Sequence, residues 1–599
     1  MQWSVGKGMC IALPKRWFVS CRGASQLFFV IWLFLCYSQS SVGAISPAEI
    51  KPAAIDPARV RERFVPSLDE DLEDLSSSSL KEKFTMVPKA PIIHSNETQE
   101  QGVKFKLVDV VIVGSTVYRG GELTQYYKPY LGKEVYFQDL QKIAAAITVQ
   151  YRKDGYVISQ AIVPAQQVKD GVVKILVVEG YISGIYLEGD VSKVRSQINK
   201  FGKKIQQMRP LQIDQLERYL LLLNDISGLT VKTVLSPAMS DMGAADLTFV
   251  AEQKRVSTNL AYDNRGSRYM GPSEIIGGLI VNDVAMSADK MSMQTIVTPL
   301  HSELRYFHVG YNFPCWNDGL RVNVTGSFTE TNPGFSIKIL DLVGRSKNWT
   351  IEFEYPWLRT KTKNFWLYGK LDWLDSYTNF DSYTVFFDQI RSLRLGAFYD
   401  FIDRWKGANS IDLEISKGLT RSPLEPYPDL SRYHGRTDYT KIGMKMSHYH
   451  PLLNNMIFLV AITGQYSFNN KLLSAEEFSF GGSQFGRAYD SSEISGDSGV
   501  AGKVELRFDT YPNLKFLQQI QYYTFYDLGA VWNVGEEAHI QGAKNSGSNL
   551  GFGLRTTVKE CIYGSIEIVR PLTKKVDTQV MAGQSGKAWR FFINLGFNM

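Results

Sequence analysis

The sequence has almost none of the long apolar runs that identify helical membrane proteins. Although 44% of its 599 residues are hydrophobic, its mean hydropathy is −0.16. A helical membrane protein of this size would contain repeated apolar stretches of about 20 residues. The sequence has one apolar stretch of note, Leu27–Tyr37, close to the N-terminus. A bundle of transmembrane helices is therefore excluded as the fold class.

That apolar stretch has the surroundings of a signal peptide. Basic residues from Lys7 to Arg22 precede it, and the small residues Val42-Gly43-Ala44 follow it. This order predicts a signal peptide over residues 1–44 and export from the cytoplasm. The alternative, an uncleaved anchor, is less favoured because the apolar core is short for a spanning helix.

Cysteine is scarce as well. Cys10, Cys21 and Cys36 fall in the predicted signal peptide, so the mature chain retains Cys315 and Cys561. An exported protein of this size with at most one possible disulfide is not a scaffold stapled by disulfides. Closure of a β-barrel, argued below, would have to provide the stability instead.

Several functional classes lack support. The net charge of +6 is spread along the chain without a basic block, so we expect no nucleic-acid partner. The sequence contains no HExxH motif, phosphate-binding loop, CxxC pair, zinc-type Cys/His spacing or Ser/His/Asp arrangement. We therefore expect no catalytic residues, no metal and no cofactor, and the protein is not predicted to be an enzyme.

Residues 45–103 read as a linker because they contain several prolines and the serine run 76–79. Within the linker, Asp56-Pro57 has the form of a helix start, and a short helix is predicted over 57–64. It could be a functional docking helix or a solvated linker turn.

Two copies of one β-α-α-β-β pattern follow, each of about 75 residues, which is enough to enclose a small core. We assign the first copy to residues 104–180 and the second to 181–253. The first has expected elements at 105–113, 122–130, 137–153, 157–163 and 172–178, and the second at 182–187, 191–201, 213–225, 229–235 and 246–251.

From residue 254 to 599 the apolar period changes to two. Along Lys503–Asp509, for example, Val504, Leu506 and Phe508 alternate with charged residues, and 320–328 and 349–355 behave alike. In a strand such sets point to opposite faces, one apolar and one charged.

Two features favour a membrane barrel over a soluble β-sandwich for this region. Aromatic residues gather near the expected strand ends, for example Trp349, Tyr355, Trp357, Trp366, Trp373 and Trp589. Short turns at 359–363, 403–407 and 557–560 alternate with long loops at 417–437, 468–497 and 571–586. The fold class is thus predicted as mainly β, an antiparallel transmembrane barrel of about 16 strands preceded by two α+β units.

The long loop 468–497 and a later strand carry specific motifs. The loop contains Gly-Gly-Ser-Gln-Phe-Gly-Arg-Ala-Tyr-Asp at 481–490, and the strand reads Phe-Tyr-Asp-Leu-Gly at 525–529. With tandem β-α-α-β-β units ahead of a barrel, the chain resembles the two-partner-secretion transporters, or haemolysin secretion/activation proteins, from Lys104 to its end. The units resemble polypeptide-transport-associated (POTRA) domains. The family's loop motif is [V/I]-R-G-Y; here Arg487 and Tyr489 match it, but the glycine precedes the arginine.

Strand parity places Asp527 on the lumen side together with Phe525 and Gly529, so that an inward-folded loop could bring Arg487 to it. A forked arginine–carboxylate contact would hold the loop in one position. Without the resemblance, a solvated arginine and a routine wall charge would be the simpler interpretation; the resemblance favours the pair. The predicted lumen-loop lock comprises Arg487, Tyr489, Phe485, Gly486, Asp527, Phe525 and Gly529.

The resemblance implies a transporter in the bacterial outer membrane that exports a secreted partner of the TpsA type, an adhesin or haemolysin. The POTRA units would bind the unfolded partner in the periplasm, with 172–178 and 229–235 as candidate strands for adding a partner strand. The helix at 57–64 would plug the lumen.

We also expect contact with outer-membrane lipid and a monomeric chain. A neighbouring gene for a long exported protein rich in β-helix repeats would support this reading. One alternative is a barrel-assembly factor of the same superfamily, although such relatives usually have more POTRA units. The other is a passive porin, which has no use for a tandem periplasmic module.

Overall fold

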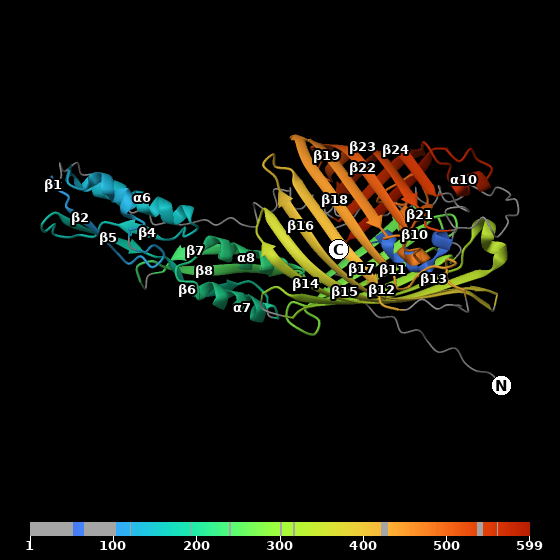
Figure 1. The fold of residues 1–599 in the computed structure, drawn as a ribbon, viewed down its shortest axis with the longest axis horizontal. Coiled ribbons are helices and arrows are strands. Elements are labelled where there is room, and N and C mark those ends of the chain that lie inside the picture. The colour runs from blue at the N-terminus through green and yellow to red at the C-terminus, as the bar shows by residue number, and fades with distance from the viewer. Residues whose placement is uncertain are drawn as a thin grey trace.

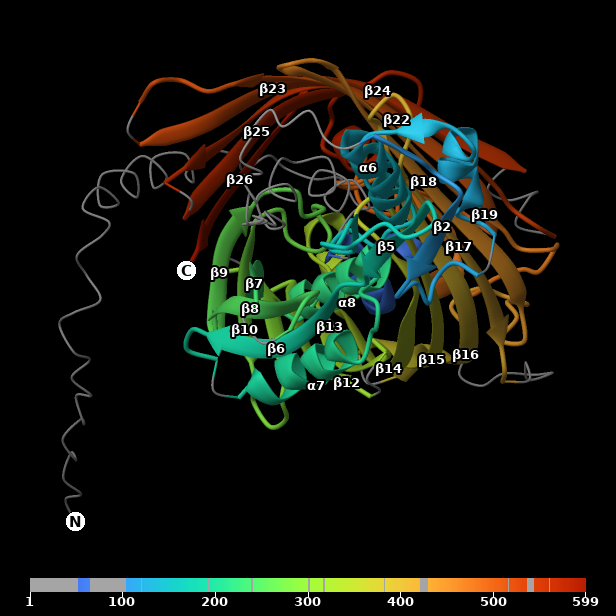
Figure 2. The ribbon, with the colours of Figure 1, turned by 90° about the vertical axis from the view of Figure 1, so that its left-hand side faces the viewer.

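The computed structural model describes residues 52–64 and 104–599, apart from 120, 192, 239–240, 300–301, 316–317, 382, 421–428, 515, 536–542 and 560. The predicted signal peptide and most of the predicted linker lie outside these residues. Two small α+β units stand in a row at one end of a large barrel (Figure 1). Viewed from that end, the units lie in front of the barrel opening (Figure 2).

The first unit packs its helices against one small sheet. Its elements are β1 (Phe105–Lys106), β2 (Asp109–Val113), α5 (Thr124–Tyr127), η3 (Lys128–Tyr130), β3 (Glu134–Val135), α6 (Phe137–Lys153), β4 (Gln160–Ile162) and β5 (Val172–Val178). Helix α6 has the predicted bounds because its apolar residues recur at helical spacing, and Leu140, Ile143, Ile147 and Tyr151 form its buried face.

Three boundaries in this unit differ from prediction. The strand expected at 105–113 is divided, because the Leu107 N–H donates to the carbonyl of Lys133 while β2 pairs with β5. The helix expected at 122–130 is only α5 followed by a short 3-10 turn that contains Pro129, which has no N–H to donate. Strand β4 is shorter than 157–163 because a turn from Tyr156 to Ser159 precedes it.

The second unit repeats the arrangement. It contains β6 (Tyr181–Glu188), α7 (Arg195–Gln206), α8 (Ile213–Asn224), β7 (Leu229–Pro237) and β8 (Ala244–Gln253). The sheet orders are β2-β5-β4 and β6-β8-β7, each with one parallel and one antiparallel pair. Helix α7 begins later than the predicted 191, because Val191 and Val194 are core residues of the preceding turn rather than of the helix.

The sheet orders correct one candidate contact strand. The segment 172–178 is the central strand β5, hydrogen-bonded to β2 on one side and β4 on the other. It therefore has no open edge for a substrate strand. The segment 229–235 lies in β7, which is an edge strand of the second sheet.

A closed antiparallel barrel of 16 strands forms the rest of the chain, as predicted. Its strands are β9 (Val256–Asp263), β10 (Glu274–Asn282), β11 (Lys290–Val297), β12 (Leu304–Pro314), β13 (Arg321–Thr331), β14 (Leu342–Arg359), β15 (Lys363–Phe380), β16 (Tyr383–Ile402), β17 (Ala408–Gly418), β18 (Thr440–Leu453), β19 (Met456–Tyr466), β22 (Ser498–Thr510), β23 (Leu517–Trp532), β24 (Lys544–Val558), β25 (Ile562–Pro571) and β26 (Arg590–Asn598). Strand β26 closes the barrel on β9.

The two faces of the wall differ as the alternation predicts. Along β22, Val504, Leu506 and Phe508 point outward and are exposed, whereas the charged Glu505 and Arg507 point inward and are buried. An apolar outer face with a polar interior is the pattern of an outer-membrane barrel.

The short turns and long connections lie at opposite ends of the barrel. The turn between β14 and β15 meets the second unit, where Arg359 forms a forked pair with Asp225 at 2.6 and 2.9 Å. The connections between β17 and β18, β19 and β22, and β25 and β26 are at the other end. Since the units are periplasmic, these long connections face the cell exterior.

A short segment far from the barrel in sequence lies inside it. It comprises α2 (Pro52–Ile55) and the 3-10 helix η2 (Pro57–Phe64), which contacts β13, β14 and β15. We call Pro57–Phe64 the lumen helix. Among all the described residues, no helix has the length and apolar character to cross a membrane.

Candidate functional site: the barrel lumen and its long loop

The connection between β19 and β22, residues 467–497, folds back into the barrel. It contains η5 (Ser474–Glu476) and a small hairpin of β20 (Phe478–Phe480) and β21 (Ile494–Gly496), which contacts the wall strands β23 and β24. Phe480 and Ile494 are fully buried there. The loop is thus packed against the inner wall rather than extended into solvent.

Arg487 lies against Asp527 of β23, so the structure brings together the two residues of the predicted pair. Its Nη2 donates to Oδ1 at 2.9 Å and its Nε to Oδ2 at 3.1 Å, the forked geometry of a bidentate pair. The backbone N–H groups of Gly486 and Arg487 donate to the same Oδ2, as does the amide of Asn549. Asp527 is completely buried.

A second carboxylate that sequence parity did not single out shares the arginine. Nη1 of Arg487 donates to Glu505 at 2.8 Å, and Glu505 also accepts from Arg507 and Arg555. The guanidinium carbon lies 3.3 Å from the ring centroid of Phe525. Burial lowers the pKa of Arg487, but the two carboxylates outweigh burial and hold that pKa well above its usual value.

Two glycines allow the loop to approach the wall. Gly486 has φ = 78°, a left-handed conformation that glycine adopts without strain. A Cβ on Gly529 would lie 2.3 Å from the ring of Phe480, so the hairpin fits only because that side chain is absent. The motif glycines therefore have a steric role in this packing.

The remaining motif residues fasten the loop elsewhere. Tyr489 is 2% exposed, and its hydroxyl donates to the carbonyls of Ser548 and Lys574 at 3.0 and 3.3 Å. Phe485 packs against the cluster around Phe480, and its carbonyl accepts from Gly481 N. Thus each of the predicted lock residues contacts the loop or the wall beside it.

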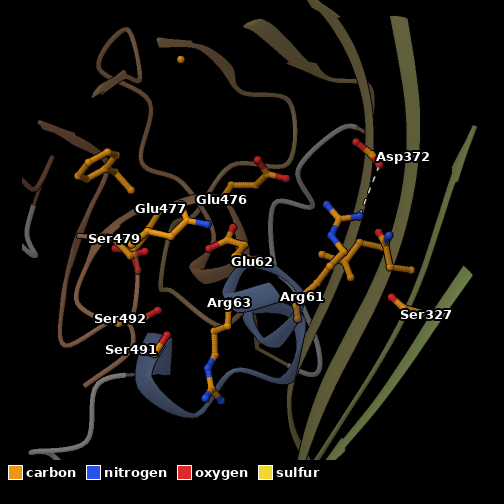
Figure 3. A pocket seen from close by; sticks show the side chains of 18 of the residues that line it. Arg61, Glu62, Arg63, Ser327, Asp372, Glu476, Glu477, Ser479, Ser491 and Ser492 are labelled. Carbon is orange, nitrogen blue, oxygen red and sulfur yellow. Dashed lines mark ion pairs between the residues drawn. The ribbon is translucent and has the colours of Figure 1, made fainter. Parts of the chain in front are cut away.

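The lumen helix contacts the other side of the interior through its arginines. Arg63 pairs with Glu274 at 2.7 Å, and Arg61 lies 3.9 Å from Asp372. Figure 3 shows Arg61 pointing from the helix to Asp372 on the wall, with Glu476 and Glu477 of the long loop on the opposite side. Arg59 is buried against that loop.

Around the lumen helix lies a polar cavity of about 850 Å³. Charged groups of both signs line it, including Glu352, Lys370, Asp372, Arg394, Glu414 and Lys441. Burial tends to raise the pKa of Glu476, but Arg394 and Lys441 lower it to about 2. The described residues contain no group of His, Cys, Asp or Glu suited to hold a metal ion.

Several residues of this site were beyond sequence reasoning. Glu505 has lumen parity, but so do many charged residues of the wall. Arg59 and Arg432 contact partners that are distant in the chain, and no local pattern marks them. The helix start at Asp56-Pro57 was the one available signal for the segment that contains Arg59.

Comparisons with known proteins agree with this architecture. The profile of the POTRA domain, ShlB-type, matches residues 105–180, and that of the haemolysin secretion/activation proteins ShlB/FhaC/HecB matches residues 246–554. The second match covers more than half of the chain.

Individual relatives extend over most of the chain at low identity. The heme/hemopexin transporter protein HuxB of Haemophilus influenzae is 24% identical over 508 residues, which cover 83% of this chain and 88% of that protein. The outer membrane transporter CdiB of Dickeya dadantii is 20% identical over 80% of this chain and 84% of its own length. The solved structure of CdiB from Escherichia coli has a TM-score of 0.72 at 18% identity, covering 93% of this chain and all of that chain.

Proposed function

The chain belongs to the haemolysin secretion/activation protein family ShlB/FhaC/HecB and is an outer-membrane transporter of two-partner secretion; from this premise we propose how it moves its partner. The partner is an adhesin or haemolysin that arrives unfolded in the periplasm, and both α+β units bind it there. It then passes through the lumen after the lumen helix has moved, while the long loop stays against the wall. The proposal is supported by one observation above all: arginine–carboxylate contacts hold both of these segments inside the barrel.

Partner recognition begins at the open edge of the first sheet. Strand β2 is an edge strand, and near its first residue lies a cavity of about 700 Å³ lined by Phe105, Val108, Phe137 and Val168 among others. An extended partner segment could add to β2 through backbone hydrogen bonds, which tolerate many sequences, and insert alternate apolar side chains into the cavity. The edge strand β7 offers a second place for the same contact.

The lumen helix acts as the plug of the resting transporter. Its arginines neutralise carboxylates from the wall and the long loop, and these contacts can be exchanged for water when the helix leaves. The Arg487–Asp527 lock fixes the loop while the partner passes. The lumen helix can leave the lumen without the breaking of a covalent bond or of the hydrogen bonds between the barrel strands.

Transport needs no catalytic residue of this chain, because folding of the partner outside the cell biases its movement outward. A single chain suffices, since the barrel closes on itself through β9 and β26. The exposed apolar face of the wall contacts the lipid of the outer membrane.

The test separates recognition from barrel closure. Deletion of 104–180 should abolish export of the partner while leaving a heat-modifiable barrel in the outer membrane. A finer variant, Val168→Asp, places a charge in the cavity and should reduce export strongly. Its matched control is Val149→Asp on α6, where the valine is 63% exposed and outside the cavity. Normal export by the deletion or by Val168→Asp would refute the recognition step.

A further inference from the structure

A second buried arginine holds the extracellular end of the long loop. Arg432, in the connection between β17 and β18, is 4% exposed. Its Nη1 donates to Asp497 Oδ1 at 2.6 Å and to the carbonyl of Leu472 at 2.7 Å, and its Nη2 lies 3.4 Å from Asp497 Oδ2. Leu472 is near the start of the long loop and Asp497 is its last residue, so one guanidinium joins both ends of the loop.

Asp497 gathers further contacts at this point. It is completely buried, and it accepts the backbone N–H groups of Leu472 at 2.7 Å and Val534 at 2.8 Å. Val534 follows β23, so three extracellular connections converge on this carboxylate. Charge-assisted hydrogen bonds of this kind are among the stronger polar contacts in proteins.

Residues 472–477 of the long loop contact the lumen helix. Arg59 is 3% exposed; its Nη1 donates to the carbonyl of Ser474 and its Nη2 to that of Glu477, both at 3.1 Å. Ala58 packs against the apolar cluster that contains Leu472 and Leu473. On this side the lumen helix therefore binds the backbone of segment 472–477, and the position of that segment depends on the contacts that hold it in turn.

Glu477 links the two arginines directly. Its Oε1 lies 3.2 Å from Nη1 of Arg432, and its Oε2 lies 3.7 Å from Nη1 of Arg59. The charges therefore alternate along the row Arg59, Glu477, Arg432 and Asp497. Removal of Arg432 would release the Leu472 carbonyl and take a cation away from both carboxylates.

We propose that Arg432 is a positioning residue that holds segment 472–477 in the form that receives Arg59, and so keeps the lumen helix in place. Arg432 acts on the helix through the loop. It is separate from the Arg487–Asp527 lock, which fastens a different part of the loop to the wall. This inference rests on the proposed role of the lumen helix as a plug.

Single-channel recording of the full chain in planar bilayers tests this role. Arg432→Ala should raise the ratio of open to closed time by about tenfold or more, the change expected when a charge-assisted hydrogen bond is lost. Arg432→Lys keeps the charge without the forked contact, and its ratio of open to closed time should lie between those of the wild type and Arg432→Ala. The matched control is Arg436→Ala on the same connection, because that side chain is half-exposed and pairs locally with Asp438.

A double mutant shows whether Arg432 acts through Arg59. Arg59→Ala alone should also increase opening, and Arg59→Ala combined with Arg432→Ala should add little to either single change. Additive effects, or wild-type gating of Arg432→Ala or Arg432→Lys, would overturn the assignment. If Arg432→Ala does not insert, judged by heat-modifiable mobility, Arg432→Lys decides alone. Deletion of 52–64 provides the separate check: unchanged conductance there would refute the plug itself, whereas opening there with normal gating in the Arg432 variants would refute only this inference.

Discussion

Replacement of Arg487 by alanine is the perturbation for which the structure gives the sharpest expectation. The change removes the fork to Asp527 and the contact with Glu505, all within a buried part of the lumen. The barrel ladder does not depend on these contacts, so the barrel should still insert. The loop should leave the wall more often, and export should fall.

The size of this effect depends on the contacts that Asp527 and Glu505 keep after the arginine is lost. Removing one partner of a buried ion pair costs about 3–5 kcal/mol. Asp527 would keep the N–H of Gly486 and the amide of Asn549, and Glu505 would keep Arg507 and Arg555, so we expect about 2–4 kcal/mol. Because about 1.4 kcal/mol is a factor of ten, the released population should rise roughly 30- to 700-fold.

Cysteine accessibility measures that population. Ala488 is completely buried beside the lock, so Ala488→Cys in a chain with Cys315→Ser and Cys561→Ser reports release of the loop through labelling by an impermeant thiol reagent on intact cells. Arg487→Ala should label much faster, and Arg487→Lys should restore part of the protection. The exposed Arg570→Ala is the control.

The same assay can refute the reasoning. Asp527→Ala should resemble Arg487→Ala, and the double mutant should be little worse than either because both changes remove one contact. Additive labelling rates, or full protection in either single variant, would show that the contact does not hold the loop.

Three further predictions follow from other parts of the chain. Cysteines placed in loops 417–437 and 571–586 should react with the impermeant reagent on intact cells, whereas one in the turn 359–363 should not; labelling of the turn would contradict the strand count. Gly529→Ala should weaken the packing of the loop by about 1–3 kcal/mol, because the new Cβ would clash with Phe480, and so should speed labelling of the Ala488→Cys chain. The control Gly443→Ala has room for a Cβ and should leave that labelling unchanged. Equal labelling rates of the two variants would contradict this packing. Burial and the nearby Asp490 and Asp577 raise the pKa of Glu493 from 4.5 to about 8. The stabilisation that protonated Glu493 gives to the folded loop is therefore full below pH 4.5 and is lost as the pH rises through 8. Labelling of the Ala488→Cys chain, normalised to an exposed cysteine, should therefore rise between about pH 6 and about pH 9; Glu493→Gln should remove this rise, and its persistence would contradict the assignment.

The sequence was informative where a periodic pattern had enough length. Helix α6 and strand β5 have the predicted bounds, and the alternation along β22 gives the correct faces, because burial of one face determines the pattern in each case. The strand expected at 105–113 failed because its break depends on a bond from Leu107 to Lys133, which no local pattern reveals.

The site was predictable only in part. Arg487 and Asp527 could be chosen because the loop motif marks the arginine, and the strand motif at 525–529 together with strand parity marks the aspartate. Arg432 and Arg59 could not, because each is buried by folding of segments that are remote in sequence. A lone arginine in a loop is ordinarily solvated, and only the three-dimensional packing of the extracellular connections changes that expectation.

Passage of the partner through the lumen is the central claim, and site-specific crosslinking during export tests it most directly. Ser327 faces the cavity around the lumen helix, whereas the next residue, Phe328, faces outward and is 37% exposed. A photo-crosslinking residue at 327 should capture the exported partner in transit, and the same residue at 328 should not. Capture from position 328, or none from 327 while export continues, would contradict transport through the barrel.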